Sequence, residues 1–404
     1  MKWFKLLCIA ITFVIVGCSG QAAPIGCAAN GVGGGSSDPC ATGGTGGAAV
    51  SLNSVISISN TVQSACALLV NKTVKCWGSN YNGKLGDGTT TDNMSPVLVV
   101  GISTAKKLVS GTEFYCVLLE EGTVKCWGRN NFGQMGTGAT GGADALTPQV
   151  IPSVAGAIDV AAGYEHGIAL INDGTVMCWG GAGYHACGVS GTALSPMKIS
   201  SILGATAISA YGSHNCAIMN DMTVKYWGWM CGQANDACKI TDTPITMKDA
   251  NGLLLSSVSV IASGQWNNMA VSSVNLFAWG YNKYGQLGDG TTTDNLNAVP
   301  VTGISYTRSI SSGYLHNCAV LEDGTAWCWG YNGNGEFGNG TTTGSSTPVQ
   351  VSGITNAVSV SAGEGATCVV LKNGTAWCWG ENRNGRLGDG TTTNRLTPVQ
   401  VIGL

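Results

Sequence analysis

Residues 318–330 read CAVLEDGTAWCWG, and residues 368–380 repeat the phrase as CVVLKNGTAWCWG. Each copy holds two cysteines on either side of a turn and ends in Trp-Gly. Trp-Gly recurs seven times, at intervals of 48 to 52 residues. A repeat period near fifty residues is typical of propellers and solenoids, in which each unit packs against the next. The seven tryptophans are Trp77, Trp127, Trp179, Trp227, Trp279, Trp329 and Trp379.

The last unit shows what one repeat contains. Short β-rich runs occupy 357–362, 368–371, 375–379 and 398–402, separated by Gly, Asn and Asp. Four such runs without helical periodicity predict a four-stranded antiparallel sheet. The second and third runs are apolar at nearly every residue, which indicates a sheet covered on both faces. Radially stacked blades provide that cover. The sequence therefore predicts an all-β fold, a seven-bladed β-propeller of four-stranded antiparallel blades, over residues 51–404.

The recurring positions of each unit resemble the repeat of the regulator of chromosome condensation family. The resemblance spans all seven units and implies a seven-bladed propeller. A nuclear member of that family is a nucleotide exchange factor for the GTPase Ran on chromatin, and a secreted bacterial member inhibits β-lactamases by protein–protein contact. Fold alone assigns neither role. In unit six the matching residues are Gly313, His316, Asp323-Gly324-Thr325, Trp329-Gly330, Asn332, Gly335, Phe337-Gly338, Gly340 and Pro348.

The N-terminus resembles an export signal. Two lysines in MKWFK precede the apolar run LLCIAITFVIVG, which suits a signal peptide and is too short to span a bilayer. Ile15–Cys18 (IVGC) resembles a bacterial lipobox, so we expect removal of residues 1–17 and a lipid on Cys18. An ordinary secretory signal is the alternative. Residues 18–50 are rich in Gly, Ser and Ala and predict a flexible tether.

These features predict a lipoprotein of the cell envelope, with the outer membrane suspected, or an extracellular protein if the lipobox is not used. The chain has a net charge of −3, and only 10% of its residues are charged. It has no run of Lys or Arg, so it lacks the basic face that nucleic acid requires. We therefore expect no nucleic-acid partner, and membrane contact only through the N-terminal lipid.

The cysteine phrase predicts a hairpin. With Gly324 in the left-handed position of the loop 322–324, residue 321 pairs with 325, and Cys318 lies opposite Cys328. In a non-hydrogen-bonded pair the Cα atoms lie about 4.5 Å apart, which a disulfide can bridge. An oxidising compartment favours this interpretation over free thiols or a metal. The predicted disulfides are Cys66–Cys76, Cys116–Cys126, Cys318–Cys328 and Cys368–Cys378.

The remaining cysteines do not follow this rule. Unit five has Asn268 and Ala278 in place of the pair, Cys178 faces Ile168, and Cys216 faces Tyr226. Setting aside two of the 17 cysteines, one in the signal and one lipidated, leaves 15, so at least one thiol is free or intermolecular. The sequence leaves open the pairing of Cys27, Cys40, Cys178, Cys187, Cys216, Cys231 and Cys238.

Three motifs resemble ligand-binding sequences but are better explained as parts of the repeat. GSNYNGKL at 78–85 is one residue short of a P-loop, and Lys84 is replaced by Gln, Glu or Arg in other units. His185 and Cys187 have the spacing of zinc ligands. The same spacing occurs in unit six between His316 and Cys318, where the cysteine is predicted to form a disulfide. LGDGTTT at 85–91 lacks the alternating acids of a calcium loop. We therefore expect no metal, no cofactor and, since no catalytic motif stands out, no enzymatic activity.

Units two to five depart from the regular loops, and such departures often map to the binding face of a repeat protein. They place aromatic residues and Met at loop tips, where these side chains anchor protein interfaces. The alternative is that they fold back as local packing. We predict a surface-exposed or secreted protein-binding module that uses the loops of units three to five; a structural envelope propeller and a carbohydrate-active or hydrolytic propeller are the alternatives. The candidate partner-binding residues are Tyr184, His185, Trp229, Met230 and Trp266.

Overall fold

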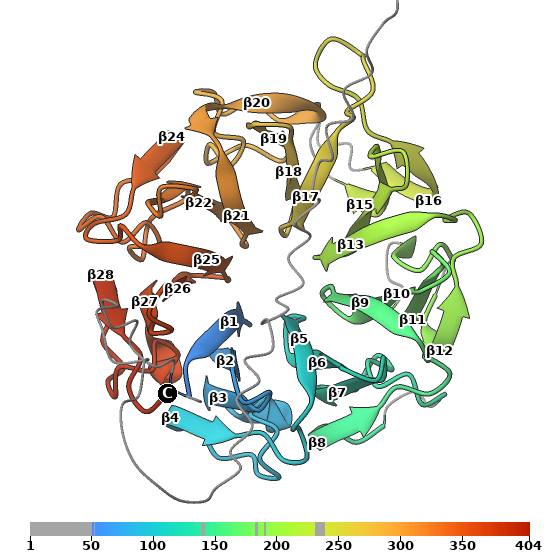
Figure 1. Ribbon diagram of the computed structural model, residues 1–404, viewed down its shortest axis with the longest axis vertical. Coiled ribbons are helices and arrows are strands. Elements are labelled where there is room, and N and C mark those ends of the chain that lie inside the picture. Colours follow the sequence, from blue (N-terminus) through green and yellow to red (C-terminus); the bar gives the residue numbers. More distant parts are fainter. Residues whose placement is uncertain (1–50, 52, 139–141, 182–184, 190, 231–238) are drawn as a thin grey trace, which may run out of the picture. The chain divides into compact units, whose positions relative to one another are not determined.

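The computed structural model describes residues 51–404 apart from 52, 139–141, 182–184, 190 and 231–238. Within this part, seven antiparallel sheets of four strands surround a central axis (Figure 1). Each sheet uses four consecutive strands in sequence order, with the first strand nearest the axis. The predicted seven-bladed propeller is confirmed. The predicted signal peptide, the lipidation site Cys18 and the tether lie outside the described residues.

The strands of blades 1 to 4 are β1 (Val55–Asn60), β2 (Ser64–Leu69), β3 (Val74–Gly78), β4 (Asn93–Leu98), β5 (Ala105–Ser110), β6 (Phe114–Leu119), β7 (Val124–Gly128), β8 (Ala145–Val150), β9 (Ala157–Ala162), β10 (His166–Ile171), β11 (Val176–Gly180), β12 (Ala193–Lys198), β13 (Ala205–Tyr211), β14 (His214–Met219), β15 (Val224–Met230) and β16 (Lys239–Thr246). Those of blades 5 to 7 are β17 (Val258–Ser263), β18 (Asn267–Ser272), β19 (Asn275–Gly280), β20 (Asn295–Ser305), β21 (Thr307–Ser312), β22 (His316–Leu321), β23 (Ala326–Gly330), β24 (Ser345–Gln350), β25 (Ala357–Ala362), β26 (Ala366–Leu371), β27 (Ala376–Gly380) and β28 (Arg395–Gln400). Single 3₁₀ turns follow β3 and β27, namely η1 (Tyr81–Gly83) and η3 (Arg383–Gly385). No helix in the described part of the chain is long and apolar enough to cross a membrane.

The hydrophobic core lies between neighbouring blades. Each tryptophan of the Trp-Gly motif is fully buried, and six of them donate a ring N–H to a backbone carbonyl of the preceding blade. Trp329, for example, donates to the Gln286 carbonyl at 2.8 Å. A Cβ added at Gly288 would lie 2.8 Å from the same ring, so glycine is needed where the indole crosses the neighbouring loop. The motif therefore fastens one blade to the next.

The ring closes by the same contacts. Trp77 of blade 1 donates to the Arg386 carbonyl of blade 7 at 2.9 Å, and the Asn60 amide donates to the Ser361 carbonyl at 3.0 Å. One hydrophobic cluster combines blade 1 residues such as Val55 with blade 7 residues such as Val370. Among the described residues, each blade is built from consecutive strands and no strand is shared between the chain ends. Contacts between blades 1 and 7 therefore close the ring without a shared strand. The sequence alone did not determine how the ring closes.

The hairpin register agrees with the prediction in blade 6. Val320 pairs with Ala326 and Cys318 with Cys328, and Gly324 has a φ of +86°. Disulfides join the two strands in blades 1, 2, 6 and 7, with Cα atoms 4.0 to 4.1 Å apart. These four pairs are Cys66–Cys76, Cys116–Cys126, Cys318–Cys328 and Cys368–Cys378.

Blade 5 departs from the prediction. Ala278 pairs with Met269, whereas Asn268 pairs with Trp279. The reason is a shorter turn: β18 and β19 are joined by the two residues Ser273 and Val274, while the turn of blade 6 holds three residues between its closing pair. The expected equivalence of Asn268 with a cysteine is therefore wrong by one position, and Met269 occupies that place.

The extra cysteines of blades 3 and 4 behave differently from one another. Cys178 pairs with Ile168 across the strands, as predicted, and forms its disulfide with Cys187 in the following loop. Cys216 faces Tyr226, also as predicted, and is a buried free thiol. Burial raises the pKa of Cys216 to about 12, which keeps the thiol protonated and unreactive at neutral pH. Cys27, Cys40, Cys231 and Cys238 lie outside the described residues.

Candidate binding face

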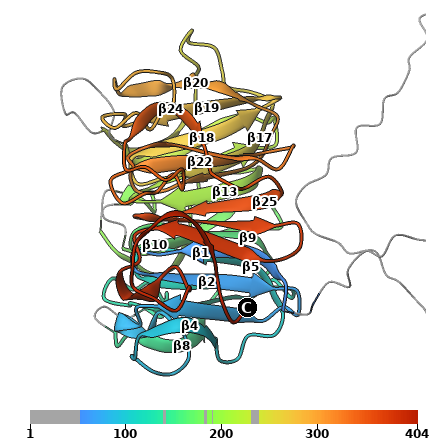
Figure 2. The same cartoon turned by 90° about the vertical axis from the view of Figure 1, so that its left-hand side faces the viewer.

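Two sets of loops share one face of the propeller. Because the strands of a blade alternate in direction, the link from the first to the second strand and the link from the third to the fourth emerge on the same side. Figure 2 shows the strands running between the two faces of the ring. We call the face that carries these two sets of links the loop face. The opposite face carries the turns between second and third strands and the links between blades.

A backbone hydrogen bond brings the two loops of each blade together. In all seven blades, the residue after Trp-Gly donates its N–H to the carbonyl of the residue that precedes the second strand, at 2.7 to 3.0 Å. In blade 5, Tyr281 donates to Trp266, and in blade 6, Tyr331 donates to Leu315. Side chains from two separate loops therefore gather at one place on each blade. The donors are Ser79, Arg129, Gly181, Trp229, Tyr281, Tyr331 and Glu381.

Blades 5 and 6 carry an aromatic cluster at this place, which we define as Trp266, Tyr281, Tyr284, Tyr314 and Tyr331. The ring centroids of Trp266 lie 5.3 Å from Tyr281 and 5.2 Å from Tyr314. Those of Tyr284 and Tyr331 lie 5.4 Å apart, nearly perpendicular to each other. Such edge-to-face pairs contribute about 0.5–1.5 kcal/mol beyond the area they bury. Tyr284 is 45% exposed, so the cluster has an outer ring that a partner can reach.

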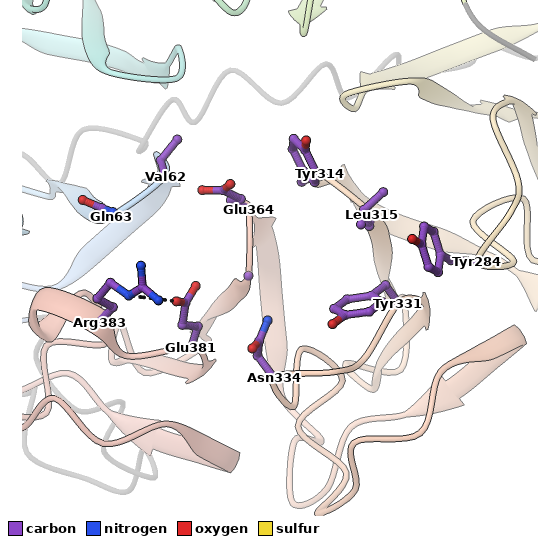
Figure 3. A pocket seen from close by; sticks show the side chains of 11 residues that line it. Val62, Gln63, Tyr284, Tyr314, Leu315, Tyr331, Asn334, Glu364, Glu381 and Arg383 are labelled. Carbon is purple, nitrogen blue, oxygen red and sulfur yellow. Dashed lines mark ion pairs between the residues drawn. The ribbon is translucent and has the colours of Figure 1, made fainter.

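Charged side chains of blade 7 face the cluster across a pocket of about 350 Å³. Figure 3 shows Tyr284, Tyr314 and Tyr331 on one side and Glu364 and Glu381 nearer the other. Glu381 forms ion pairs with Arg383, at 3.5 Å, and with the buried Arg386. Arg386 also donates to the Val62 carbonyl of blade 1, so the wall of this pocket spans the seam where the ring closes.

A second pocket of about 500 Å³ lies beside the first and shares Val62, Tyr314 and Glu364 with it. It extends toward blades 2 to 4, where Tyr164 in a link, Tyr211 at the end of β13 and Trp229 in β15 supply aromatic rings. The carboxylates in its lining are Glu113, Glu165 and Glu364. Because most of its residues come from the links between first and second strands, which lie nearest the axis, we call it the mouth pocket.

Burial sets the electrostatics of the mouth pocket. It is the largest cause that raises the pKa of Glu165 and of Glu364 above the usual value. Burial also raises the pKa of Tyr211 and Tyr314, and the neighbouring Glu364 adds to both shifts. Both phenols are therefore neutral at physiological pH. The lining combines neutral aromatic rings with carboxyl groups that solvent stabilises poorly.

The structure brings together only part of the predicted site. Trp266 belongs to the aromatic cluster, and Trp229 lines the mouth pocket. The predicted place of Trp229 at a loop tip is wrong, because β15 extends beyond Trp-Gly and pairs Trp229 with Ile240. His185 is half-buried and has a left-handed backbone, with a φ of +64°. The backbone of Met230 ends β15, but its side chain and the whole of Tyr184 lie outside the described residues.

The sequence analysis missed four tyrosines of the cluster, two of them in the regular unit six. Tyr281 and Tyr331 follow Trp-Gly directly, and Tyr314 precedes the second strand. A usable signal was present: these positions vary between units, whereas the residues around them recur. Variation inside a constant frame marks positions that the fold does not need, which are the positions free to serve binding.

The motifs set aside as structural have structural partners. Lys84 is buried, and its carbonyl accepts the Trp127 ring N–H at 2.9 Å. The Asp87 carboxylate of LGDGTTT accepts the backbone N–H of Thr89 at 2.9 Å, which closes a tight turn. Among the described residues no group of three or more His, Cys, Asp or Glu could hold a metal ion.

Comparison with known proteins agrees with this architecture. The regulator of chromosome condensation repeat matches in two forms, which together cover more than half of the chain. One form matches residues 105–134, 157–186, 308–336 and 357–386, and the other matches 121–170, 275–320, 323–370 and 373–404.

Solved structures share the fold at low identity. Prp20p of Saccharomyces cerevisiae, studied with its binding to Gsp1p and histones, is 20% identical over 77% of this chain and 80% of its own, with a TM-score of 0.65. Human WBSCR16 is 21% identical over 81% and 94%, with a TM-score of 0.69. Yeast RCC1 bound to Kap60 is 21% identical over 86% and 85%, with a TM-score of 0.68. At this identity the likeness concerns the fold.

Proposed function

We propose that this chain, which belongs to the regulator of chromosome condensation repeat family, is a non-catalytic protein-binding module whose loop face recognises the partner. The aromatic cluster of Trp266, Tyr281, Tyr284, Tyr314 and Tyr331 carries this proposal. Tyr and Trp in a partly buried cluster with a polar rim are typical anchors of protein interfaces. The site includes blade 6, so it is wider than the loops of units three to five.

Two further observations support binding by a face. One protein of the same fold, the yeast protein Prp20p, was studied for binding to Gsp1p and histones and was also solved in complex with Kap60. The side chains of the cluster are also held in place before any partner arrives, because the backbone bonds from Tyr281 to Trp266 and from Tyr331 to Leu315 fix both loops. A pre-organised surface loses less entropy on binding.

The partner can be trapped by placing a photo-cross-linking amino acid at Tyr284 in the full chain, within the envelope of the producing cell. We expect a discrete cross-linked protein, and its affinity for the purified chain should fall at least about tenfold in Y284A/Y331A, since anchor residues contribute about 2 kcal/mol or more. Tyr306 provides the matched control because it is 64% exposed and lies in a link on the opposite face. Equal affinity of Y284A/Y331A, Y306A and the unchanged chain would reject the loop face as the site.

The same proposal places the propeller on the cell envelope, anchored by a lipid on Cys18 and carried on the tether 18–50. The apolar run before Cys18 and the lipobox-like Ile15–Cys18 support it. Radiolabelled palmitate should enter the full chain and be lost completely in Cys18→Ala. Labelling that persists in this variant, or absence of label in the unchanged chain, would reject the lipid anchor on Cys18 and favour a secreted protein.

A further inference from the structure

Carboxylates outnumber cations in the lining of the mouth pocket. Three glutamates line it, Glu113, Glu165 and Glu364, against one cation, Arg129. Arg129 is already engaged, since its guanidinium lies 2.6 Å from the Glu113 carboxylate and over the ring of Phe132. Glu165 and Glu364 have no such close ion pair, although Arg129 acts to lower the pKa of Glu165. From outside the lining, Arg386 acts in the same way on Glu364.

Glu165 and Glu364 are the two lining carboxylates that form no close ion pair. Within the described part of the chain, neither accepts a hydrogen bond nor forms an ion pair within 4.0 Å. Both are about half-buried, and burial raises the pKa of each. Burial outweighs the effect of the more distant cations on the pKa of both groups, so a cation bound beside them stabilises the charged carboxylates.

Aromatic rings complete the pocket. Tyr164 of blade 3, Tyr211 of blade 4 and Tyr314 of blade 6 all contribute to its lining, and Tyr164 is 40% exposed. They lie close enough together that Tyr164 and Tyr314 both influence the pKa of Tyr211. The face of a neutral phenol attracts an ammonium or guanidinium group, by about 0.5 kcal/mol at exposed sites and more where water is excluded.

The central channel behind the pocket offers no stronger cation site. Its lining is rich in serine, and its one lysine, Lys107, is ion-paired with Asp159. Several of these serines are used between blades; Ser59 donates to Ser110, and Ser209 accepts the N–H of Ser263. Of these two linings, only that of the mouth pocket contains carboxylates.

We infer that the mouth pocket binds the cationic head of a lysine or arginine side chain presented by the protein partner, between Tyr164, Tyr211 and Tyr314 and the carboxylates of Glu165 and Glu364. This rests on the proposed function, because a protein partner supplies the side chain. The pocket volume of about 500 Å³ accommodates such a side chain with adjoining backbone. A neutral sugar would use the rings and leave both carboxylates uncompensated, and an anion would be repelled.

The test uses the purified full chain and small probes, so no partner is required. N-acetyl-arginine amide and N-acetyl-lysine amide are titrated by calorimetry and ligand-observed NMR, beside the neutral citrulline analogue and an uncharged oligosaccharide. We expect saturable binding of the two cations, and at least tenfold weaker binding of citrulline and the sugar. The comparison with citrulline uses the unchanged protein, so it does not depend on any variant folding.

Charge-neutral variants then locate the site. E165Q/E364Q keeps the size of both side chains and should weaken cation binding at least tenfold. E120Q/E322Q removes two carboxylates from turns on the opposite face and should leave it unchanged. Equal binding of citrulline, preferential binding of the sugar, or equal loss in both variants overturns the inference.

The outcomes also separate this inference from the proposed function. Cross-linking of a partner at Tyr284 together with no arginine or lysine binding would reject the cation pocket and keep the protein-binding face. Saturable cation binding that E165Q/E364Q abolishes, with no partner trapped at Tyr284, would support the pocket and reject recognition through the aromatic cluster.

Discussion

Replacing Trp329 with alanine is expected to lower the free energy of unfolding by about 3–5 kcal/mol. The side chain is fully buried between blades 5 and 6 and packs with residues such as Leu287 and Val301. Its removal leaves a cavity and leaves the Gln286 carbonyl without the 2.8 Å bond from the indole. Urea denaturation followed by circular dichroism, with the disulfides intact, measures the loss.

Trp327 provides the matched control, since it lies two residues earlier in the same strand, β23. Its ring is only half-buried and donates to its own neighbour, the Thr325 hydroxyl, at 3.0 Å. Trp327 packs at the edge of the same hydrophobic cluster, so its change to alanine should also destabilise the protein, but clearly less than the change at Trp329, because its ring is only half-buried and bonds within its own blade. Similar losses for the two variants would mean that Trp-Gly is not the fastening between blades.

The fold could be predicted because the same structural motif recurs seven times in the sequence. Trp-Gly is needed in every blade for the same physical reason, so its spacing reveals the ring. Register could be predicted in blade 6, where Gly324 closes a three-residue turn, and was misplaced in blade 5, where Ser273 and Val274 form a shorter one. Deleting one turn residue shifts every partner by one position while Trp279 keeps its place in the core.

The site could be predicted only in part, because it is assembled from contacts between blades. Trp229 and Trp266 lie in segments whose sequence departs from the repeat, and this departure identified them, although Trp229 belongs to the extended strand β15. Tyr314 and Tyr331 lie in a regular unit, so their place beside Trp266 depends on the ring bringing blades 5 and 6 together. Likewise, no repeat rule predicts the Cys178–Cys187 disulfide, which forms within one irregular loop.

Three buried histidines connect neighbouring blades and make the ring sensitive to acid. His166 shares a hydrogen bond of 2.8 Å with the Asn215 side chain of the next blade, and His214 one of 2.9 Å with Asn268. His316 bonds the Thr367 hydroxyl at 2.8 Å. Burial is the main cause that lowers the pKa of His166 and His214 to about 4 and that of His316 to about 3.

The folded protein therefore holds these imidazoles neutral, whereas the unfolded chain protonates them near pH 6.5. Their contribution to stability is full above pH 6.5 and is lost as the pH falls toward the folded pKa values. Together the three should lower the free energy of unfolding by about 5 kcal/mol between pH 7 and pH 5. Urea midpoints recorded at pH 7, 6 and 5 measure this fall.

The variant H166N/H214N/H316N isolates the histidine contribution, because blade 5 already carries asparagine at the corresponding position, Asn267. We expect it to be less stable at pH 7, since each asparagine is shorter, but its stability should change far less with pH. Carboxylates titrate in both proteins, so they cancel when the two pH profiles are subtracted. Parallel profiles would show that the imidazoles are not held neutral between the blades, and that acid acts on the ring through other groups.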